Sequence, residues 1–207
     1  RPDILAVNSS DAYSLFKKEK YPINELAQAE SLRHLYIEKY LDKFNAKKNN
    51  SGSLKLIVLG DYFEFNTEFQ LSLLNSLSSK TTKKLKIILK PHPSSRIKES
   101  WYSSLDLEIK NNPLKSLLPE ADIVFTSLTT SAAVEAYCFG LKVITALDPN
   151  SLNLSPLREK KDVYFVKSSF ELENVLIKLI ADGTFNRQSR SFFYIDKDLN
   201  KWKRFLY

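Results

Sequence analysis

One residue in this sequence that could do acid–base chemistry near neutral pH is a histidine between two prolines. His92 is one of only two histidines, and it lies between Pro91 and Pro93 directly after Lys90 and the hydrophobic run LKIIL. Because proline fixes φ and ends a strand ladder, an ordinary turn explains this pattern if the histidine is incidental. The alternative is an imidazole held at the end of a strand and directed into a ligand crevice, with Lys90 and Pro93 beside it.

A cluster of hydroxyl groups follows another hydrophobic run, DIVFT, and comprises Ser127, Thr129, Thr130 and Ser131. The alanine-rich AAVEAYCFG that comes next predicts a helix. Free N–H groups, the helix dipole and short hydroxyls at such a start can bind phosphate, although Ser and Thr also cap helices without a ligand. Glu135 lies one turn beyond Ser131 on the same face. Its carboxylate could accept hydrogen bonds from a ribose, and the alternative is a solvated helical glutamate.

Two more polar residues follow hydrophobic runs and are further candidates for the crevice. Asp61 comes after LKLIVLG, and Asn150 comes after KVITA. The two histidines are distant from each other and Cys138 is the only cysteine, so the sequence offers no metal-ligand cluster and predicts neither a metal nor another cofactor. Cys138 excludes an internal disulfide, favours a reducing compartment and is expected to pack rather than react.

Short β-rich runs alternate with helices between about residues 54 and 185. Strands are predicted at 54–60, 84–90, 106–110, 122–126, 142–146 and 163–166, and helices at about 67–78, 131–139 and 170–181, the last closed by Gly183. This alternation predicts an α/β fold with a doubly wound, Rossmann-like parallel sheet, as do strands nearly continuous in Val, Ile and Leu. Ligands bind such sheets outside the carboxyl ends of the strands. Because the candidate residues all follow strands, the ligand interpretation of His92 is favoured.

Residues 1–48 are predicted to form extra N-terminal helices, and residues 54–207 the Rossmann-like domain with a C-terminal helix. Ser9 and its neighbours cap a first helix to about Lys20, and an amphipathic helix runs from about 24 to 44 with His34 as a partly exposed member. The polar segment NAKKNNSGS is predicted to be a linker. From about Lys197 a last helix is expected, whose apolar residues pack on the early helices: Trp202, Phe205 and Leu206. Alternatively its basic residues face anionic lipid: Lys197, Lys201, Lys203 and Arg204.

The charge of the chain suits an anionic partner. Lys and Arg number 31 against 24 Asp and Glu, a net charge of +7, which is compatible with nucleic acid, a membrane surface or a phosphorylated ligand. The basic residues occur in short groups broken by polar or acidic neighbours, so nucleic acid is not predicted and a peripheral membrane contact stays open. No apolar run is long enough to cross a bilayer, and no signal sequence opens the chain.

The order of these motifs resembles a known group of enzymes. KPHP followed by DIVFTSLTTSAAVEAYCFGLKVIT is similar to the C-terminal, nucleotide-binding half of GT-B glycosyltransferases. The resemblance is closest to bacterial sialyltransferases and Kdo transferases, which carry an HP motif and a Ser-Ser/Thr motif for a CMP-sugar. Residues 7–36, 58–77, 118–158 and 192–206 look like a bacterial surface-carbohydrate-biosynthesis family, and together they cover most of the chain.

That resemblance implies a role for each motif. His92 would contact the donor phosphate or protonate it as it leaves, the hydroxyls of Thr129, Thr130 and Ser131 would hold the phosphate, and Glu135 would hold the ribose. The partners implied are a nucleotide-sugar substrate, expected to be CMP-linked, and a glycan or glycolipid acceptor in polysaccharide or lipopolysaccharide synthesis. The location implied is the cytoplasm. The resemblance also allows a peripheral position on the inner face of the bacterial membrane.

One departure from the pattern concerns completeness. In the resembling enzymes a catalytic carboxylate comes from an N-terminal Rossmann domain, whereas this sequence predicts one such domain and begins Arg1-Pro2 without Met. We therefore expect the donor-binding half of a longer, metal-independent transferase that is not catalytic alone. Two alternatives stay open. One is a GT-B enzyme that transfers or epimerises a UDP-sugar, although the chain lacks the Gly-rich turns frequent there, and the other is a non-catalytic binding or assembly domain.

Overall fold

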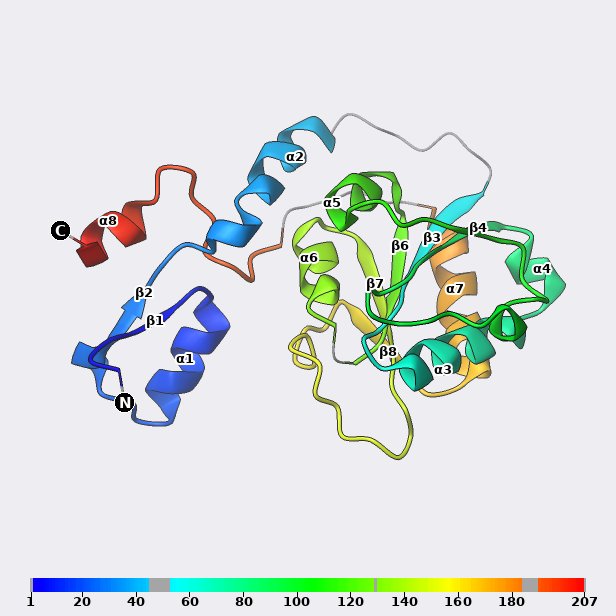
Figure 1. Cartoon of the computed structure of the whole chain (residues 1–207), viewed down its shortest axis with the longest axis horizontal. Helices are drawn as coiled ribbons and strands as arrows, with labels where there is room; N and C mark the ends of the chain where they lie inside the picture. Colours follow the sequence, from blue (N-terminus) through cyan, green and yellow to red (C-terminus); the bar gives the residue numbers. More distant parts are fainter. Residues whose placement is uncertain (1, 45–52, 129, 184–189, 207) are drawn as a thin grey trace. The chain divides into compact units, whose positions relative to one another are not determined.

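The computed structural model describes residues 2–44, 53–128, 130–183 and 190–206. The chain forms two compact units (Figure 1). The smaller unit combines Arg1–Ala46 with Gln188–Tyr207, and the larger unit comprises Lys47–Arg187. Each unit is described by itself.

The larger unit is built on a parallel sheet with the strand order β5-β4-β3-β6-β7-β8. Its strands are β3 (Leu54–Leu59), β4 (Leu85–Lys90), β5 (Leu107–Ile109), β6 (Ile123–Thr126), β7 (Lys142–Ala146) and β8 (Val163–Val166). Its α-helices are α3 (Glu64–Asn75), α4 (Ser79–Thr82), α5 (Leu114–Leu117), α6 (Ala132–Cys138) and α7 (Ser169–Asp182). Every pairing is parallel, and the chain runs outward from β3 to one edge and then from β6 to the other. The predicted doubly wound α/β sheet is confirmed.

Both faces of this sheet are covered, as Figure 1 shows for α5 and α6 on one side and α3 and α7 on the other. Alternate strand residues point to opposite faces. Leu56 and Val58 of β3 join a core cluster with leucines of α3 and α7, while their neighbour Ile57 is equally buried toward the other face. Burial on both faces explains why the strands are uninterrupted hydrophobic runs.

Helix α7 ends at the predicted glycine. Gly183 adopts φ +57°, and a Cβ added there would meet no atom within 4 Å. We expect Gly183→Ala to lower the free energy of unfolding by about 1 kcal/mol, because only the left-handed backbone penalises the new side chain. Gly183→Asn should lose less, since Asn tolerates this conformation. Urea denaturation measures both, and equal stability of wild type and Gly183→Ala would contradict the capping role.

The smaller unit is not wholly helical, which corrects the prediction for its residues. Helix α1 (Ser10–Lys18) is capped by Ser9 as predicted. The expected helix from 24 to 44 is wrong: the chain forms a 3-10 turn, strand β2 (Leu26–Gln28), a second 3-10 turn and only then α2 (Tyr36–Phe44). Strand β2 pairs in parallel with β1 (Leu5–Val7). This long-range pairing buries Leu26 and overrides the helical spacing of its neighbours. Of the predicted linker at 45–53, residues 45–52 lie outside the described residues.

The C-terminal helix α8 (Asn200–Leu206) belongs to the smaller unit and is fixed there by one buried carboxylate. Glu30 accepts hydrogen bonds from the backbone N–H groups of Lys201 (2.6 Å) and Trp202 (2.9 Å). The Trp202 indole donates to the Glu30 carbonyl at 2.9 Å. Trp202 therefore contacts the segment after β2. Leu206 is 64% exposed, contrary to its predicted packing, and the Phe205 side chain lies outside the description.

The sequence predicted that His34 is a partly exposed helical residue, and this prediction is wrong. His34 lies in the second 3-10 turn, is buried, and stacks on Phe193 with ring centroids 4.0 Å apart. Its Nδ1 lies 2.8 Å from the Ser31 hydroxyl oxygen. These contacts make His34 a packing residue of the smaller unit.

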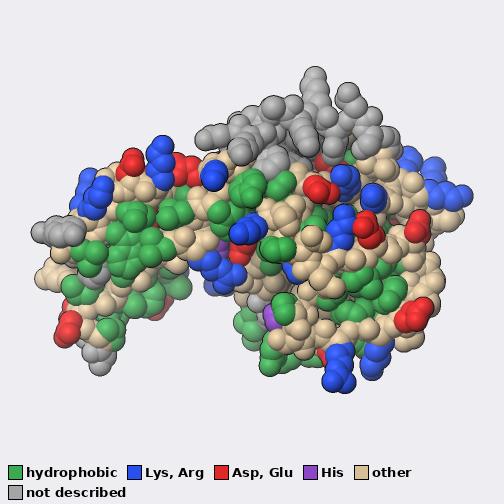
Figure 2. Space-filling view, turned by 45° about the horizontal axis from the view of Figure 1, so that its top comes forward, with side chains coloured by type: hydrophobic (Ala, Val, Ile, Leu, Met, Phe, Trp, Pro, Cys, Tyr) green, Lys and Arg blue, Asp and Glu red, His purple; other side chains and the backbone are tan. Residues whose placement is uncertain are grey.

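Basic side chains do not form one large field on the surface that Figure 2 shows; they lie in separate small groups with acidic side chains between them. The dispersed arrangement agrees with the sequence pattern, in which basic residues occur in short groups. Within the described part of the chain, no helix is long and apolar enough to cross a membrane.

Candidate functional site

Asp61 and Ser127, two of the candidate residues, follow the strands at which the sheet reverses its direction of winding. Strands β3 and β6 are neighbours, and the chain proceeds to opposite edges from them. The loops after these two strands therefore diverge at the carboxyl edge, which is the usual location of ligand sites in open α/β sheets. The loop after β4 lies at the same edge of the sheet, because β4 pairs in parallel with β3 on its other side.

Asp61 and Ser127 join the two loops directly. Asp61 is 2% exposed, and its carboxylate accepts hydrogen bonds from the Ser127 hydroxyl and from the Phe63 N–H at 2.9 Å. The Asp61 N–H in turn donates to the Thr67 hydroxyl at 2.8 Å, at the start of α3. Both residues were candidates for ligand contact. The structure uses them to hold the loop after β3 against the end of β6, which fixes the two loops relative to each other.

Gly60 lets the β3 loop approach the Pro-His-Pro turn closely. Its N–H donates to the Lys90 carbonyl at 2.9 Å. A Cβ at this position would lie 3.2 Å from the His92 nitrogen and 3.3 Å from both the Lys90 oxygen and the Pro91 Cα. All three are backbone atoms, and proline restricts how far the turn can move. The requirement for glycine here was not recognised in the sequence, because it arises from the neighbouring strand.

Gly60→Ala should therefore disturb the turn that carries His92. We expect the variant to lose about 1–3 kcal/mol of stability, as for an overpacked site, and the His92 imidazole resonances to shift. Urea denaturation and NMR spectra of the two histidines measure these effects. Gly183→Ala is the matched control, since its Cβ meets open space and should leave the His92 signals unchanged. An unshifted His92 in Gly60→Ala would contradict the close-approach argument.

The His92 ring is held so that one nitrogen is available. Its Nδ1 accepts the Ser94 N–H at 3.2 Å, so the neutral ring carries its proton on Nε2. The ring also meets Tyr62 edge-on, with centroids 5.6 Å apart. Within the described residues no partner is found for Nε2, and the side chain is half-buried. The imidazole is thus a pre-positioned hydrogen-bond donor at the carboxyl edge.

An exposed aromatic group beside His92 was not predicted from the sequence. Tyr62 and Phe65 are 62% and 60% exposed, and Phe63 lies between them with rings 5.3 and 5.7 Å away. The signal that could have revealed it is the dense aromatic spacing in DYFEF directly after a strand. Exposed aromatic faces at a crevice can stack on planar groups such as nucleobases.

The hydroxyl cluster contains fewer free donors than the sequence suggested. The N–H of Ala132 is taken by the Thr130 hydroxyl at 3.3 Å, and that of Ala133 by the Thr130 carbonyl at 3.2 Å. Thr130 thus acts as an ordinary cap of α6. Ser131 is exposed and its side chain makes no capping hydrogen bond, so its hydroxyl is available. Thr129 lies outside the described residues.

The other predicted residues have different surroundings. Glu135 is 4% exposed and held by interactions within the chain, so it is not a solvated helical glutamate. Asn150 is exposed in a turn, where its N–H donates to Asp148 at 2.9 Å. Lys90 is half-buried at the end of β4, and burial lowers the pKa of its ammonium, while Pro93 is exposed beside His92. No group of three or more His, Cys, Asp or Glu side chains suited to a metal occurs within the described ranges.

Comparison with solved structures shows the same architecture in other proteins. UDP-GlcNAc 2-epimerase from Methanocaldococcus jannaschii aligns with a TM-score of 0.59 at 13% identity over 99% of this chain and 61% of its own. The larger unit has a Rossmann-like fold of the GT-B kind. HepE from Anabaena in complex with UDP-glucose aligns with a TM-score of 0.52 at 11% identity, over 89% of this chain and 57% of its own. WaaG, a glycosyltransferase involved in lipopolysaccharide biosynthesis, gives 0.51 at 15% identity, over 88% and 55%.

These likenesses concern the fold. The chain spans 55–61% of the length of these three proteins. No family model and no curated protein matches the sequence. The neighbours include an epimerase and a glycosyltransferase of lipopolysaccharide biosynthesis, and the chain is a glycosyltransferase-like domain in its fold.

Proposed function

We propose that the larger unit binds the nucleotide of a nucleotide-sugar donor and that His92 contacts the donor phosphate. The observation that carries the proposal is the Nε2–H of His92, held at the carboxyl edge by the Ser94 N–H and by Tyr62. Transfer breaks the bond between the sugar's anomeric carbon and a phosphate oxygen, so negative charge grows on the phosphate. A fixed imidazole donor stabilises that charge or supplies a proton as the bond breaks.

Other residues of the crevice are assigned supporting roles in this proposal. The Ser131 hydroxyl, which makes no capping hydrogen bond with any described residue, is suited to a second hydrogen bond to the phosphate, and the hydroxyls of Thr129 and Thr130, the two residues before it in the sequence, are proposed to hold the same phosphate. Glu135 is proposed to accept hydrogen bonds from the ribose, and Lys90 to supply positive charge. Tyr62 offers a stacking face next to the imidazole. The chain is proposed to be the donor-binding part of a two-domain enzyme whose acceptor is a glycan or glycolipid.

Two nucleotides are candidates for the donor in this proposed function. The sequence resemblance favours a CMP-linked sialic-acid- or Kdo-like sugar. The second candidate is a UDP-sugar, because two of the structural neighbours are a UDP-GlcNAc epimerase and a protein in complex with UDP-glucose.

Titration calorimetry of the 207-residue chain with CMP, UDP and GDP tests whether the chain binds a donor nucleotide and which nucleotide it prefers. Tighter binding of CMP supports the CMP-sugar, and tighter binding of UDP replaces it with the second candidate. Equal binding of the three nucleotides would remove the CMP assignment. Absence of binding to all of them would contradict donor binding by this chain.

A further inference from the structure

The smaller unit contains a cavity that the proposed donor site does not use. Its volume is about 430 Å³, and it lies between the start of α8 and the segment that precedes this helix. The residues that line this cavity include Glu30, Tyr194, Asp196, Asn200, Lys201 and Arg204. An adjoining hollow of about 350 Å³ shares Lys201 and Arg204. A cavity of this size can hold a small ligand of a few functional groups.

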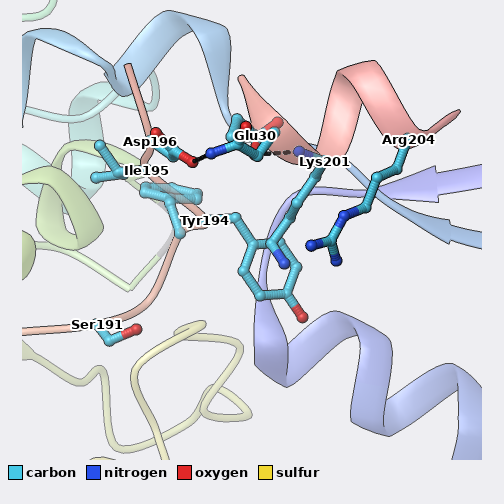
Figure 3. A pocket seen from close by; sticks show the side chains of 9 residues that line it. Glu30, Ser191, Tyr194, Ile195, Asp196, Lys201 and Arg204 are labelled. Carbon is cyan, nitrogen blue, oxygen red and sulfur yellow. Dashed lines mark hydrogen bonds between the residues drawn. The ribbon is translucent and has the colours of Figure 1, made fainter. Parts of the chain in front are cut away.

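Two cations face this space from one side of α8, as Figure 3 shows for Lys201 and Arg204 beside the Tyr194 ring. The Lys201 ammonium lies 4.6 Å from the centre of that ring and donates to the Gln28 side-chain oxygen at 3.1 Å. Both contacts fix its position without neutralising its charge. Arg204 makes no ion pair or hydrogen bond with any residue that the structure describes, and its guanidinium is exposed.

The carboxylates of the cavity are already committed to other donors. Glu30 accepts the N–H groups of Lys201 and Trp202, as described above. Asp196 accepts the N–H of Asp198 and the side-chain amide of Asn200, at 2.9 and 2.8 Å. Their oxygens are therefore directed at the turn and the helix start, and each cation is left without an acidic partner among the described residues.

Tyr194 adds a neutral donor. Burial, followed by the nearby Tyr13 and Asp11, raises the pKa of its phenol above the usual value. A phenol is protonated at neutral pH and can donate a hydrogen bond. A fixed ammonium, a free guanidinium and a phenol at one cavity form a set of donors that complements the oxygens of a phosphate or carboxylate.

We propose that this cavity binds an anionic small molecule of about monosaccharide size, a sugar phosphate or a sugar acid, with Arg204 and Lys201 holding the anionic group. The guanidinium fork would pair with two oxygens of the anion, and Lys201 would add a point charge. The remaining volume, lined by polar side chains such as Asn200 and Ser191, accommodates the sugar. The inference stands independently of donor binding in the larger unit.

NMR titration of the full chain tests the inference with three probes: inorganic phosphate, glucuronate, and vesicles with and without anionic lipid. The Arg204 side-chain N–H signal, assigned by its loss in Arg204→Gln, and the Tyr194 ring signals report on this cavity alone. We expect both sets to shift with phosphate or glucuronate, and Arg204→Gln to weaken the binding seen at Tyr194 about tenfold, as for loss of a charge-assisted bidentate contact. Lys201→Gln should weaken it less.

Lys203→Gln is the matched control, because it removes the same charge from the same helix at a residue that does not line the cavity. It should leave the affinity at Tyr194 within twofold of wild type, since an exposed charge outside the site is screened by salt. Equal losses in Arg204→Gln and Lys203→Gln would reduce the effect to general surface charge and overturn the proposal. The proposal would also be overturned if neither phosphate nor glucuronate shifted the Arg204 and Tyr194 signals, even if anionic vesicles bound.

Discussion

Replacing Asp61 by alanine should unfold the larger unit at markedly lower denaturant concentration. The buried carboxylate accepts the Ser127 hydroxyl and the Phe63 N–H, and its removal leaves both donors without that partner. Hydrogen bonds to charged groups contribute about 1.5–3 kcal/mol each, so we expect a loss of about 3 kcal/mol or more. Urea denaturation followed by circular dichroism measures this loss.

The chain contains a matched control for this prediction. Asp148 accepts the Asn150 N–H at 2.9 Å and the Ser151 hydroxyl at 3.2 Å, the same pair of donor types that bind Asp61. Its turn lies at the surface, so water can replace the lost bonds. Asp148→Ala should therefore cost under about 1 kcal/mol. If the two variants were equally stable, the link between the β3 and β6 loops would not depend on burial of Asp61.

Replacing His92 by alanine should weaken nucleotide binding while leaving the fold intact. The flanking prolines and the Ser94 N–H hold the ring in place, so little entropy is lost when a phosphate binds. A hydrogen bond to a charged group contributes about 1.5–3 kcal/mol, which corresponds to a decrease in affinity of about 10- to 150-fold. Calorimetry with the tightest-binding nucleotide measures this change, and thermal unfolding measures stability.

His34→Ala should behave in the opposite way. That ring is buried, stacked on Phe193 and within hydrogen-bonding distance of Ser31 in the smaller unit. Its removal should lower stability by about 1–3 kcal/mol, through lost packing and the lost hydrogen bond with the Ser31 hydroxyl, with no change in nucleotide affinity. A loss of stability without a loss of affinity in His92→Ala would end the proposal that His92 contacts the donor.

Local pattern was sufficient to predict the larger unit. Its strands are hydrophobic runs with turn residues between them, and their alternation with helices permits few topologies other than a doubly wound parallel sheet. Pro91 and Pro93 end β4 because their rings fix φ and remove the backbone N–H. Gly183 ends α7 because its left-handed backbone conformation is unfavourable for most other residues. The same pattern placed His92 at the carboxyl edge.

What the sequence by itself determined is therefore the fold class and which residues stand at the ends of strands. Only the tertiary structure decided how those residues are used: Asp61 is bonded to Ser127, 66 positions away, and Glu30 to the start of α8, 171 positions away. It also made a strand of Leu26–Gln28, because pairing with β1 outweighs weak helical spacing. The physical reason is that propensity, capping and periodicity act within one or two turns of chain. Burial and hydrogen bonding between distant segments depend on packing that no short stretch encodes.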